Sequence, residues 1–134
     1  MIDHINRYVS DVERHVAFYR DVLGYRLLDR GKKNDESDYA ILQGDNHELF
    51  ISEKSNCAPG NSLRHIGYCV EDVDEILRKL KKMGLAGEDA AIIVKQYSRQ
   101  LYIRDPDGLE IDLIQWTDKK GFYEDAAARN RERD

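Results

Sequence analysis

The sequence predicts a single α+β domain made of two βαβββ modules, and two observations carry this prediction. The first is an internal repeat, because residues 63–70 (LRHIGYCV) repeat the pattern of residues 2–9 (IDHINRYV). The second is that a helical pattern and three strand-like runs follow each of these segments. The 134 residues therefore divide into module one at 1–53, a linker at 54–62 and module two at 63–116, which make one domain over 1–116.

The opening strand of each module alternates apolar and polar residues, as a half-buried strand does. In the first of them, Ile5 and Val9 lie on one face and His4 lies on the other. In the second, His65 takes the place of His4. Three further strands are expected in each module, at about 25–30, 38–43 and 47–53, and at about 90–95, 98–104 and 109–116.

A helix is predicted after each opening strand. In module one, Ser10 and Glu13 have the spacing of a capping box with Ser10 as the N-cap, and Gly24 stands where a left-handed residue would end the helix. In module two the helix runs to two lysines and then to Gly84. The residues expected to face inward are Val12, Val16, Tyr19 and Leu23 in the first helix, and Val73, Ile76, Leu77 and Leu80 in the second.

Composition excludes several classes of partner. The 21 basic and 26 acidic residues give a net charge of −5 without a long basic block, so we expect no nucleic-acid partner. No apolar run is long enough for a membrane span or a signal peptide, which predicts a cytoplasmic protein with no membrane contact. Cys57 and Cys69 are too few for a disulfide framework. Residues 117–134 form a charged C-terminal tail, predicted as a frayed helix or disordered segment, with a helix covering a partner chain as the alternative.

Each module also carries an acid in its last strand. Glu48 follows Gly44 by four residues, and Asp112 follows Gly108 by four residues. Closing the two modules around a shared cup would bring four side chains together: His4, Glu48, His65 and Asp112. Two imidazoles and two carboxylates suit a divalent first-row metal ion and leave two adjacent positions for neighbouring oxygens of a substrate.

Other acids and histidines compete for these roles. A single histidine or acid on a strand is usually structural or solvated, but four at matching places in a repeat favour a metal site. Glu110 shares a face with Asp112 and is the rival ligand, since only the glycine spacing favours Asp112. His47 points away from the face of Glu48 and is predicted to be structural.

These motifs resemble the vicinal oxygen chelate superfamily, which includes glyoxalase I, extradiol dioxygenases, methylmalonyl-CoA epimerase and the fosfomycin and bleomycin resistance proteins. Besides the two histidine strands, the resemblance rests on residues 18–25 (FYRDVLGY) and 102–108 (YIRDPDG). It implies a curved mixed sheet around a central metal, helices on the outside and a homodimer. The implied metal ligands are His4, Glu48, His65 and Asp112, and the implied ion is Zn, Ni, Co, Mn or Fe.

Departures from the family pattern narrow the expected activity. Bacterial glyoxalase I has an arginine and an asparagine for glutathione where this chain has Tyr8 and Ser52, which argues against a glutathione substrate. Extradiol enzymes have a histidine before the tyrosine that matches Tyr102, and this chain has none there. We therefore expect a metal-dependent glyoxalase-like lyase or isomerase that acts on a small-molecule substrate with vicinal oxygens through an enolate. The alternatives are a metal-dependent dioxygenase and a metal-free, drug-sequestering binding protein.

The resemblance also suggests individual roles. Glu48 is the favoured catalytic base, because a ligand carboxylate can leave the metal and accept a proton, and Glu110 is the reserve. Tyr8, Tyr102 and Arg104 have the parity of residues that face the cup and are the candidate substrate contacts.

Overall fold

The computed structural model describes residues 1–55, 63–104, 106 and 109–133. Most of the predicted linker, with Cys57, and the turn glycine Gly108 lie outside these residues. The elements follow in the order β1 (Ile2–Val9), α1 (Val12–Leu23), β2 (Arg26–Lys32), β3 (Asp38–Gln43), β4 (Glu48–Glu53), β5 (Leu63–Cys69), α2 (Val73–Lys82), β6 (Ile93–Val94), β7 (Ser98–Arg104), β8 (Glu110–Trp116) and α3 (Lys119–Arg133).

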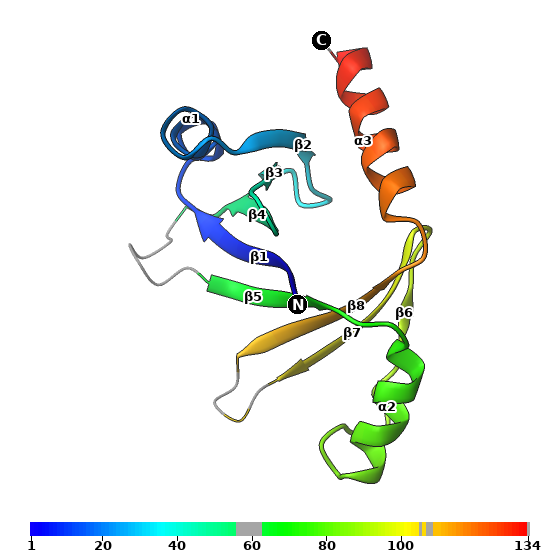
Figure 1. Ribbon diagram of the computed structural model, residues 1–134. Helices are drawn as coiled ribbons and strands as arrows, with labels where there is room; N and C mark the ends of the chain where they lie inside the picture. Colours follow the sequence, from blue (N-terminus) through cyan, green and yellow to red (C-terminus); the bar gives the residue numbers. More distant parts are fainter. Residues whose placement is uncertain (56–62, 105, 107–108, 134) are drawn as a thin grey trace.

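The eight strands of the described residues form one curved sheet in the order β2-β3-β4-β1-β5-β8-β7-β6 (Figure 1). Within each module the first and last strands are parallel neighbours, β1 with β4 and β5 with β8. The modules meet where β1 and β5 pair in the antiparallel sense. The predicted α+β class and its curved mixed sheet are therefore confirmed, and the first strands of both modules lie at the centre of the sheet.

The helices α1 and α2 cover the convex face of the sheet. α1 packs on the apolar positions of β4, while Arg99 of β7 forms an ion pair of 2.7 Å with Asp74 of α2. Because side chains alternate along a strand, the residues between these positions point to the concave face. The main buried cluster of module one consists of Val9, Val12, Val16, Ala40, Leu42, Leu49 and Ile51.

The ends of α1 differ in detail from the prediction. The N-cap is Asp11, whose carboxylate accepts a hydrogen bond of 3.0 Å from the Arg14 amide, so Ser10 lies one residue before the cap. Gly24 does adopt the predicted left-handed conformation, with φ of 75°. Leu23 was expected to pack inward, but it is 56% exposed because it lies in the last turn, beyond the helix contact with the sheet.

The C-terminal segment is a helix and not the frayed or disordered tail that the sequence suggested. α3 lies over the concave side and contacts β2 (Figure 1). Its far end is held by the buried Asp29, which accepts a hydrogen bond of 3.1 Å from Asn130 and lies 3.5 Å from the guanidinium of Arg129. Ala126, a residue of α3 itself, is fully buried. The sequence missed this docking because polar contacts, and not an apolar stripe, carry much of it.

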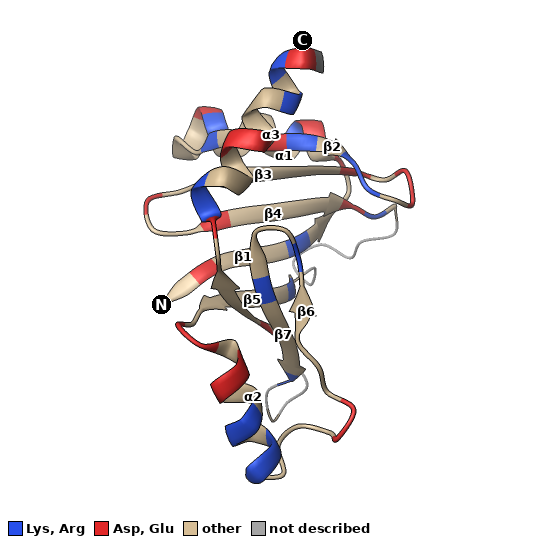
Figure 2. Cartoon of the chain, turned by 90° about the vertical axis from the view of Figure 1, so that its right-hand side faces the viewer, with Lys and Arg blue, Asp and Glu red and all other residues tan. Residues whose placement is uncertain are grey.

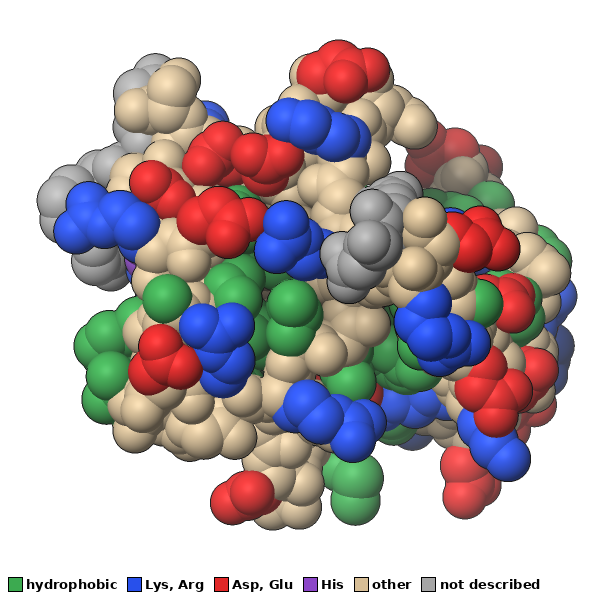
Figure 3. Space-filling view, turned by 90° about the horizontal axis from the view of Figure 1, so that it is seen from above, with side chains coloured by type: hydrophobic (Ala, Val, Ile, Leu, Met, Phe, Trp, Pro, Cys, Tyr) green, Lys and Arg blue, Asp and Glu red, His purple; other side chains and the backbone are tan. Residues whose placement is uncertain are grey.

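The surface of the molecule carries charges of both signs. Acidic and basic side chains alternate with apolar ones over the face seen in Figure 3. Within the described part of the chain, no helix combines the length and the apolar character needed to cross a bilayer.

Candidate metal centre

Two rows of in-register residues cross the concave face from β4 to β7. The first row is Glu48, His4, Gly67, Asp112 and Tyr102. The second row is Phe50, Asn6, His65, Glu110 and Arg104. It lies two residues further along β4, β1 and β7, and two residues earlier along β5 and β8. Paired residues on neighbouring strands project to the same face of a sheet, so both rows point into the concavity.

Three side chains from these rows converge on one point. The Nε2 atoms of His4 and His65 are 3.0 Å apart, and Asp112 Oδ2 lies 3.3 Å from the first and 3.9 Å from the second. Their possible ligand atoms all lie within 4.8 Å of one another, and all three residues are buried. Both modules of a single chain therefore contribute to this group, which we call the triad.

Gly67 makes room for the triad. It lies between His4 and Asp112 in the first row, and a Cβ atom at this position would collide with the His4 ring. The missing side chain lets the imidazole and the carboxylate meet across the intervening strand. The sequence signal was a glycine in the interior of a strand, which often marks a close approach of other groups.

Two further carboxylates orient the histidines. Asp3 accepts a hydrogen bond of 2.7 Å from His4 Nδ1, and Glu110 lies 3.2 Å from His65 Nδ1. Each contact holds the ring so that its Nε2 atom points to the other two members of the triad, an arrangement typical of metal-binding histidines. Asp3 was not predicted for this role, because strict alternation would turn it away from His4. A register shift between Ile2 and His4 brings it to the same side.

The donor set fits a divalent ion. Asp112 Oδ2 accepts a hydrogen bond of 2.7 Å from Gln100, but its Oδ1 atom is buried and has no hydrogen-bond partner among the residues that the structure describes. A buried carboxylate oxygen without a partner is costly, and a cation would satisfy it. Two imidazoles and one carboxylate are ligands that zinc, iron, nickel, cobalt or manganese accept.

The two histidines of the triad differ in their affinity for a proton. Burial alone would lower the pKa of His4, but hydrogen bonds to Asp112 and Asp3 outweigh it and raise this pKa to about 9. Burial and the positive charge of His4 lower the pKa of His65. The charged form is therefore favoured at His4, whose Nε2 atom lies 3.0 Å from Nε2 of His65 and 3.3 Å from Oδ2 of Asp112.

Metal affinity is expected to rise with pH, because an ion must displace the proton on His4. Between the ordinary histidine value of 6.5 and the raised value of about 9, the dissociation constant should fall roughly tenfold per pH unit. Competition with a chelator for Co²⁺ or Zn²⁺ at several pH values measures this constant. An affinity that stays flat across this window, with no proton released on binding, would contradict the assignment.

A cavity of about 530 Å³ opens above the triad. Aromatic rings stand beside the two histidines: Phe50 stacks on His4 at 4.6 Å, and Tyr102 meets His65 edge-on at 5.8 Å. Burial, followed by the negative charge of Asp112, raises the pKa of Tyr102 to about 12, so its hydroxyl stays protonated. Three basic residues also line the cavity: Arg64, Lys95 and Arg129.

The sequence profile of the glyoxalase/bleomycin resistance protein/dioxygenase superfamily matches residues 1–113. The chain belongs to this superfamily. It is 31% identical over 120 residues to the lactoylglutathione lyase of Salmonella typhimurium, with 82% of this chain and 88% of that protein covered. It is also 30% identical over 86 residues to metapyrocatechase 2 of Cupriavidus necator, with 64% of this chain and 26% of that protein covered.

Solved structures from the superfamily share the fold. Methylmalonyl-CoA epimerase from Mycobacterium tuberculosis superimposes with a TM-score of 0.71 at 20% identity, over 90% of this chain and 91% of that chain. A glyoxalase/bleomycin resistance protein/dioxygenase superfamily member from Vibrio splendidus gives 0.63 at 18% identity, over 86% and 97%.

The fourth predicted ligand is not with the other three. Glu48 neighbours His4 in the first row, but its carboxylate turns to the ammonium of Lys119 at the start of α3, 2.9 Å away. The glycine spacing that paired Glu48 with Asp112 also fails as a structural equivalence. By strand register the counterpart of Glu48 is Glu110, since the two lie opposite His4 and His65. Asp112 joins the histidines because it lies beside Gly67.

The other predicted site residues divide between the cavity and its surroundings. Tyr102 lines the cavity, whereas Glu48 and Glu110 do not. Tyr8 lies beneath two cations, 4.8 Å from Lys54 Nζ and 5.6 Å from the Arg64 guanidinium. Arg104 lines a separate hollow of about 240 Å³ together with Tyr102 and Glu110. His47 is structural, since its ring hydrogen-bonds the Tyr25 hydroxyl at 2.8 Å.

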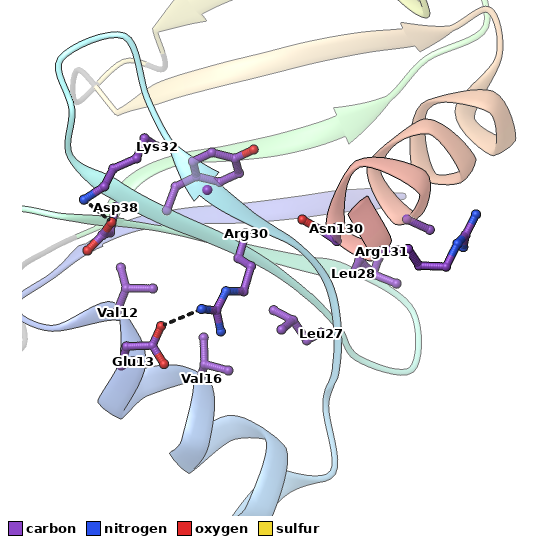
Figure 4. Close-up of a pocket in the computed structure, with 13 residues that line it drawn as sticks. Val12, Glu13, Val16, Leu27, Leu28, Arg30, Lys32, Asp38, Asn130 and Arg131 are labelled. Atoms are coloured by element: carbon purple, nitrogen blue, oxygen red, sulfur yellow. Dashed lines mark ion pairs between the residues drawn. The ribbon is translucent and has the colours of Figure 1, made fainter. Parts of the chain in front are cut away.

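A second cavity, of about 580 Å³, lies between α1, β2 and α3 (Figure 4). Two of its basic side chains are already paired, Arg30 with Glu13 at 3.4 Å and Lys32 with Asp38 at 2.7 Å. The described residues of its lining include no histidine or cysteine. The cavity above the triad is therefore the better candidate for chemistry.

Proposed function

We propose that the chain is a metal-dependent lyase or isomerase that binds a small substrate through two vicinal oxygens and acts through an enolate. The observation that carries this proposal is the convergence of His4, His65 and Asp112 at the base of a cavity large enough for a small molecule. The sequence similarity to a lactoylglutathione lyase supports the lyase class. A divalent ion held by the triad would polarise neighbouring substrate oxygens and acidify the adjacent carbon.

The chain's own residues provide binding and orientation. Asp3 and Glu110 fix the two imidazole rings, and Gln100 fixes the carboxylate of Asp112. The protonated hydroxyl of Tyr102 can donate a hydrogen bond to a substrate oxygen in the cavity. Positioned donors of this kind stabilise developing negative charge without reorganisation.

The wall of the cavity favours an anionic substrate. Arg64 and Lys95 line it, together with Arg129, which pairs with Asp29 at 3.5 Å, whereas Asp112 is the acidic residue among its described lining. This local excess of positive charge contrasts with the net charge of −5 for the whole chain. A carboxylate or phosphate on the substrate would be attracted to these cations. We therefore propose an anionic substrate whose vicinal oxygens reach the triad.

A ring-cleaving dioxygenase is the second candidate, and the ligand set is also compatible with it. Two histidines and one carboxylate are the donors of many non-haem Fe²⁺ oxygenases. The chain is also similar over part of its length to metapyrocatechase 2. On this reading the cavity would take a catechol, and activity would require both Fe²⁺ and oxygen.

One experiment separates these functions. Protein loaded with Zn²⁺, Ni²⁺, Co²⁺, Mn²⁺ or Fe²⁺ is screened against thiol adducts of 2-oxoaldehydes, 2-hydroxy and 2-oxo acids, acyl-CoA thioesters and catechols. For a lyase or isomerase we expect metal-dependent exchange of solvent deuterium at the carbon beside a carbonyl, without oxygen uptake. Oxygen uptake with catechol would favour the dioxygenase. Failure to bind any of these metals would instead favour a metal-free binding protein.

The homodimer and the cytoplasmic location remain predictions from the sequence.

A further inference from the structure

We propose that Lys119 keeps Glu48 away from the metal, so that His4, His65 and Asp112 alone hold the ion. This inference deepens the proposed function and rests on it. It assigns to Lys119 the role of setting the number of protein ligands.

The backbone places Glu48 within reach of the triad. It pairs with His4 across the parallel strands β1 and β4, and both side chains leave the same face of the sheet. Such neighbours have Cα atoms about 5 Å apart, so a turn about the side-chain bonds of Glu48 could bring its carboxylate toward the ion. The orientation of this side chain therefore depends on its partners.

Lys119 is the partner that turns Glu48 away. Its ammonium lies 2.9 Å from Glu48 Oε1 and 3.2 Å from Asp3 Oδ1, and the side chains of both acids are at most 6% exposed. The same ammonium lies 5.7 Å from the centre of the Trp116 ring. Figure 2 shows the basic first turn of α3 beside the acidic start of β4. One cation thus lies between two buried carboxylates next to the triad.

The docking of α3 holds Lys119 in this position. The far end of the helix is tied to β2 through Asn130, Arg129 and Asp29, and Phe122 near its start packs against Trp116 at 5.3 Å. Moving the ammonium would require breaking the ion pair or shifting the helix. Removing the charge would leave Glu48 buried without a cation, and a metal ion at the triad would then be the nearest replacement.

The consequence is a site with three protein ligands. An ion that accepts about six donors would keep three positions for substrate or water, against two if Glu48 also bound. The extra position would allow a substrate to bind through two oxygens while one further site stays open.

Metal affinities of a four-protein cycle test this inference. The proteins are the wild type, Glu48→Gln, Lys119→Met and the double variant, and chelator competition measures the Co²⁺ dissociation constant of each. We expect Glu48→Gln alone to change the constant by less than about threefold, and Lys119→Met to tighten binding about tenfold or more. In the Lys119→Met background, Glu48→Gln should remove that gain.

Controls separate the effect of Glu48 from simple charge repulsion. Lys119→Arg retains the cation and should bind Co²⁺ like the wild type, as should Lys120→Met, whose exposed side chain pairs with Glu124 at 3.6 Å. A gain that survives in the double variant would show that Lys119 acts only by its charge, and would overturn the inference. So would a loss of more than about tenfold in Glu48→Gln alone, which needs no Lys119 variant to fold. Absence of Co²⁺ binding by the wild type would overturn the metal-dependent function itself and the inference with it.

Discussion

Replacing His65 by alanine is expected to abolish stoichiometric metal binding and to lower turnover by about three powers of ten. The change leaves only His4 and Asp112 of the triad and removes the ring that Glu110 orients. Metal polarisation of a substrate oxygen contributes several kcal/mol to catalysis, and each 1.36 kcal/mol corresponds to a factor of ten in rate. Metal analysis after dialysis and a turnover assay measure the two losses.

His47→Ala is the matched control for His65→Ala. Its ring lies just before β4 and also hydrogen-bonds a neighbour, Tyr25, but it does not line the cavity above the triad. We expect this variant to retain one metal ion per chain. A His65→Ala protein that still binds one ion tightly, or a His47→Ala protein that loses it, would show that the triad is not the metal centre.

Replacing Asp3 by alanine should weaken both the fold and the metal centre. Asp3 accepts hydrogen bonds from His4 and Trp116 and pairs with Lys119, so its loss leaves buried polar groups without a partner. Breaking the buried pair of Asp3 with His4 costs about 3–5 kcal/mol, and losing the carboxylate that orients a metal-binding histidine costs about 10–100-fold in metal affinity. Urea unfolding of the metal-free protein measures the first loss, and chelator competition measures the second.

The stability lost in Asp3→Ala should depend on pH. Burial would raise the pKa of Asp3, but hydrogen bonds from His4, Cys69 and Trp116 outweigh it and hold this pKa well below its ordinary value of 3.8. A carboxyl group of this kind stabilises the folded state fully above its ordinary pKa and loses that effect as the pH falls toward the lowered one. The difference between wild type and variant should therefore shrink in acid. The exposed Asp21→Asn is the control, and an equally large loss there would contradict the prediction.

The repeat in the sequence was enough to predict the fold and the position of both histidines. His4 and His65 occupy matching strands because alternation places each opposite the apolar residues of its strand, and this pattern is local. The orientation of Glu48 could not be predicted in the same way. It depends on Lys119, which a docked helix brings close only in the folded chain.

The roles of Asp3 and α3 were missed because neither leaves a pattern in the sequence. Asp3 reaches His4 through a register shift in β1, and a bulge of this kind leaves no mark in the alternation of residues. α3 docks through Asp29, a carboxylate buried in β2, so its sequence lacks the apolar stripe that identifies a packed helix. Glu110 was predicted as a rival ligand, and the register of β5 and β8 explains its place behind His65.

The two halves of the metal centre differ, although the sequence repeat relates their strands. Phe50 lies opposite Asn6 in module one, and its counterpart opposite Gly67 in module two is Asp112. An aromatic ring on one side therefore corresponds to a carboxylate on the other. A planar intermediate lying across the centre would present two different faces to these walls. Proton return would then favour one face, so the product of an isomerase or lyase built on this site should be a single enantiomer.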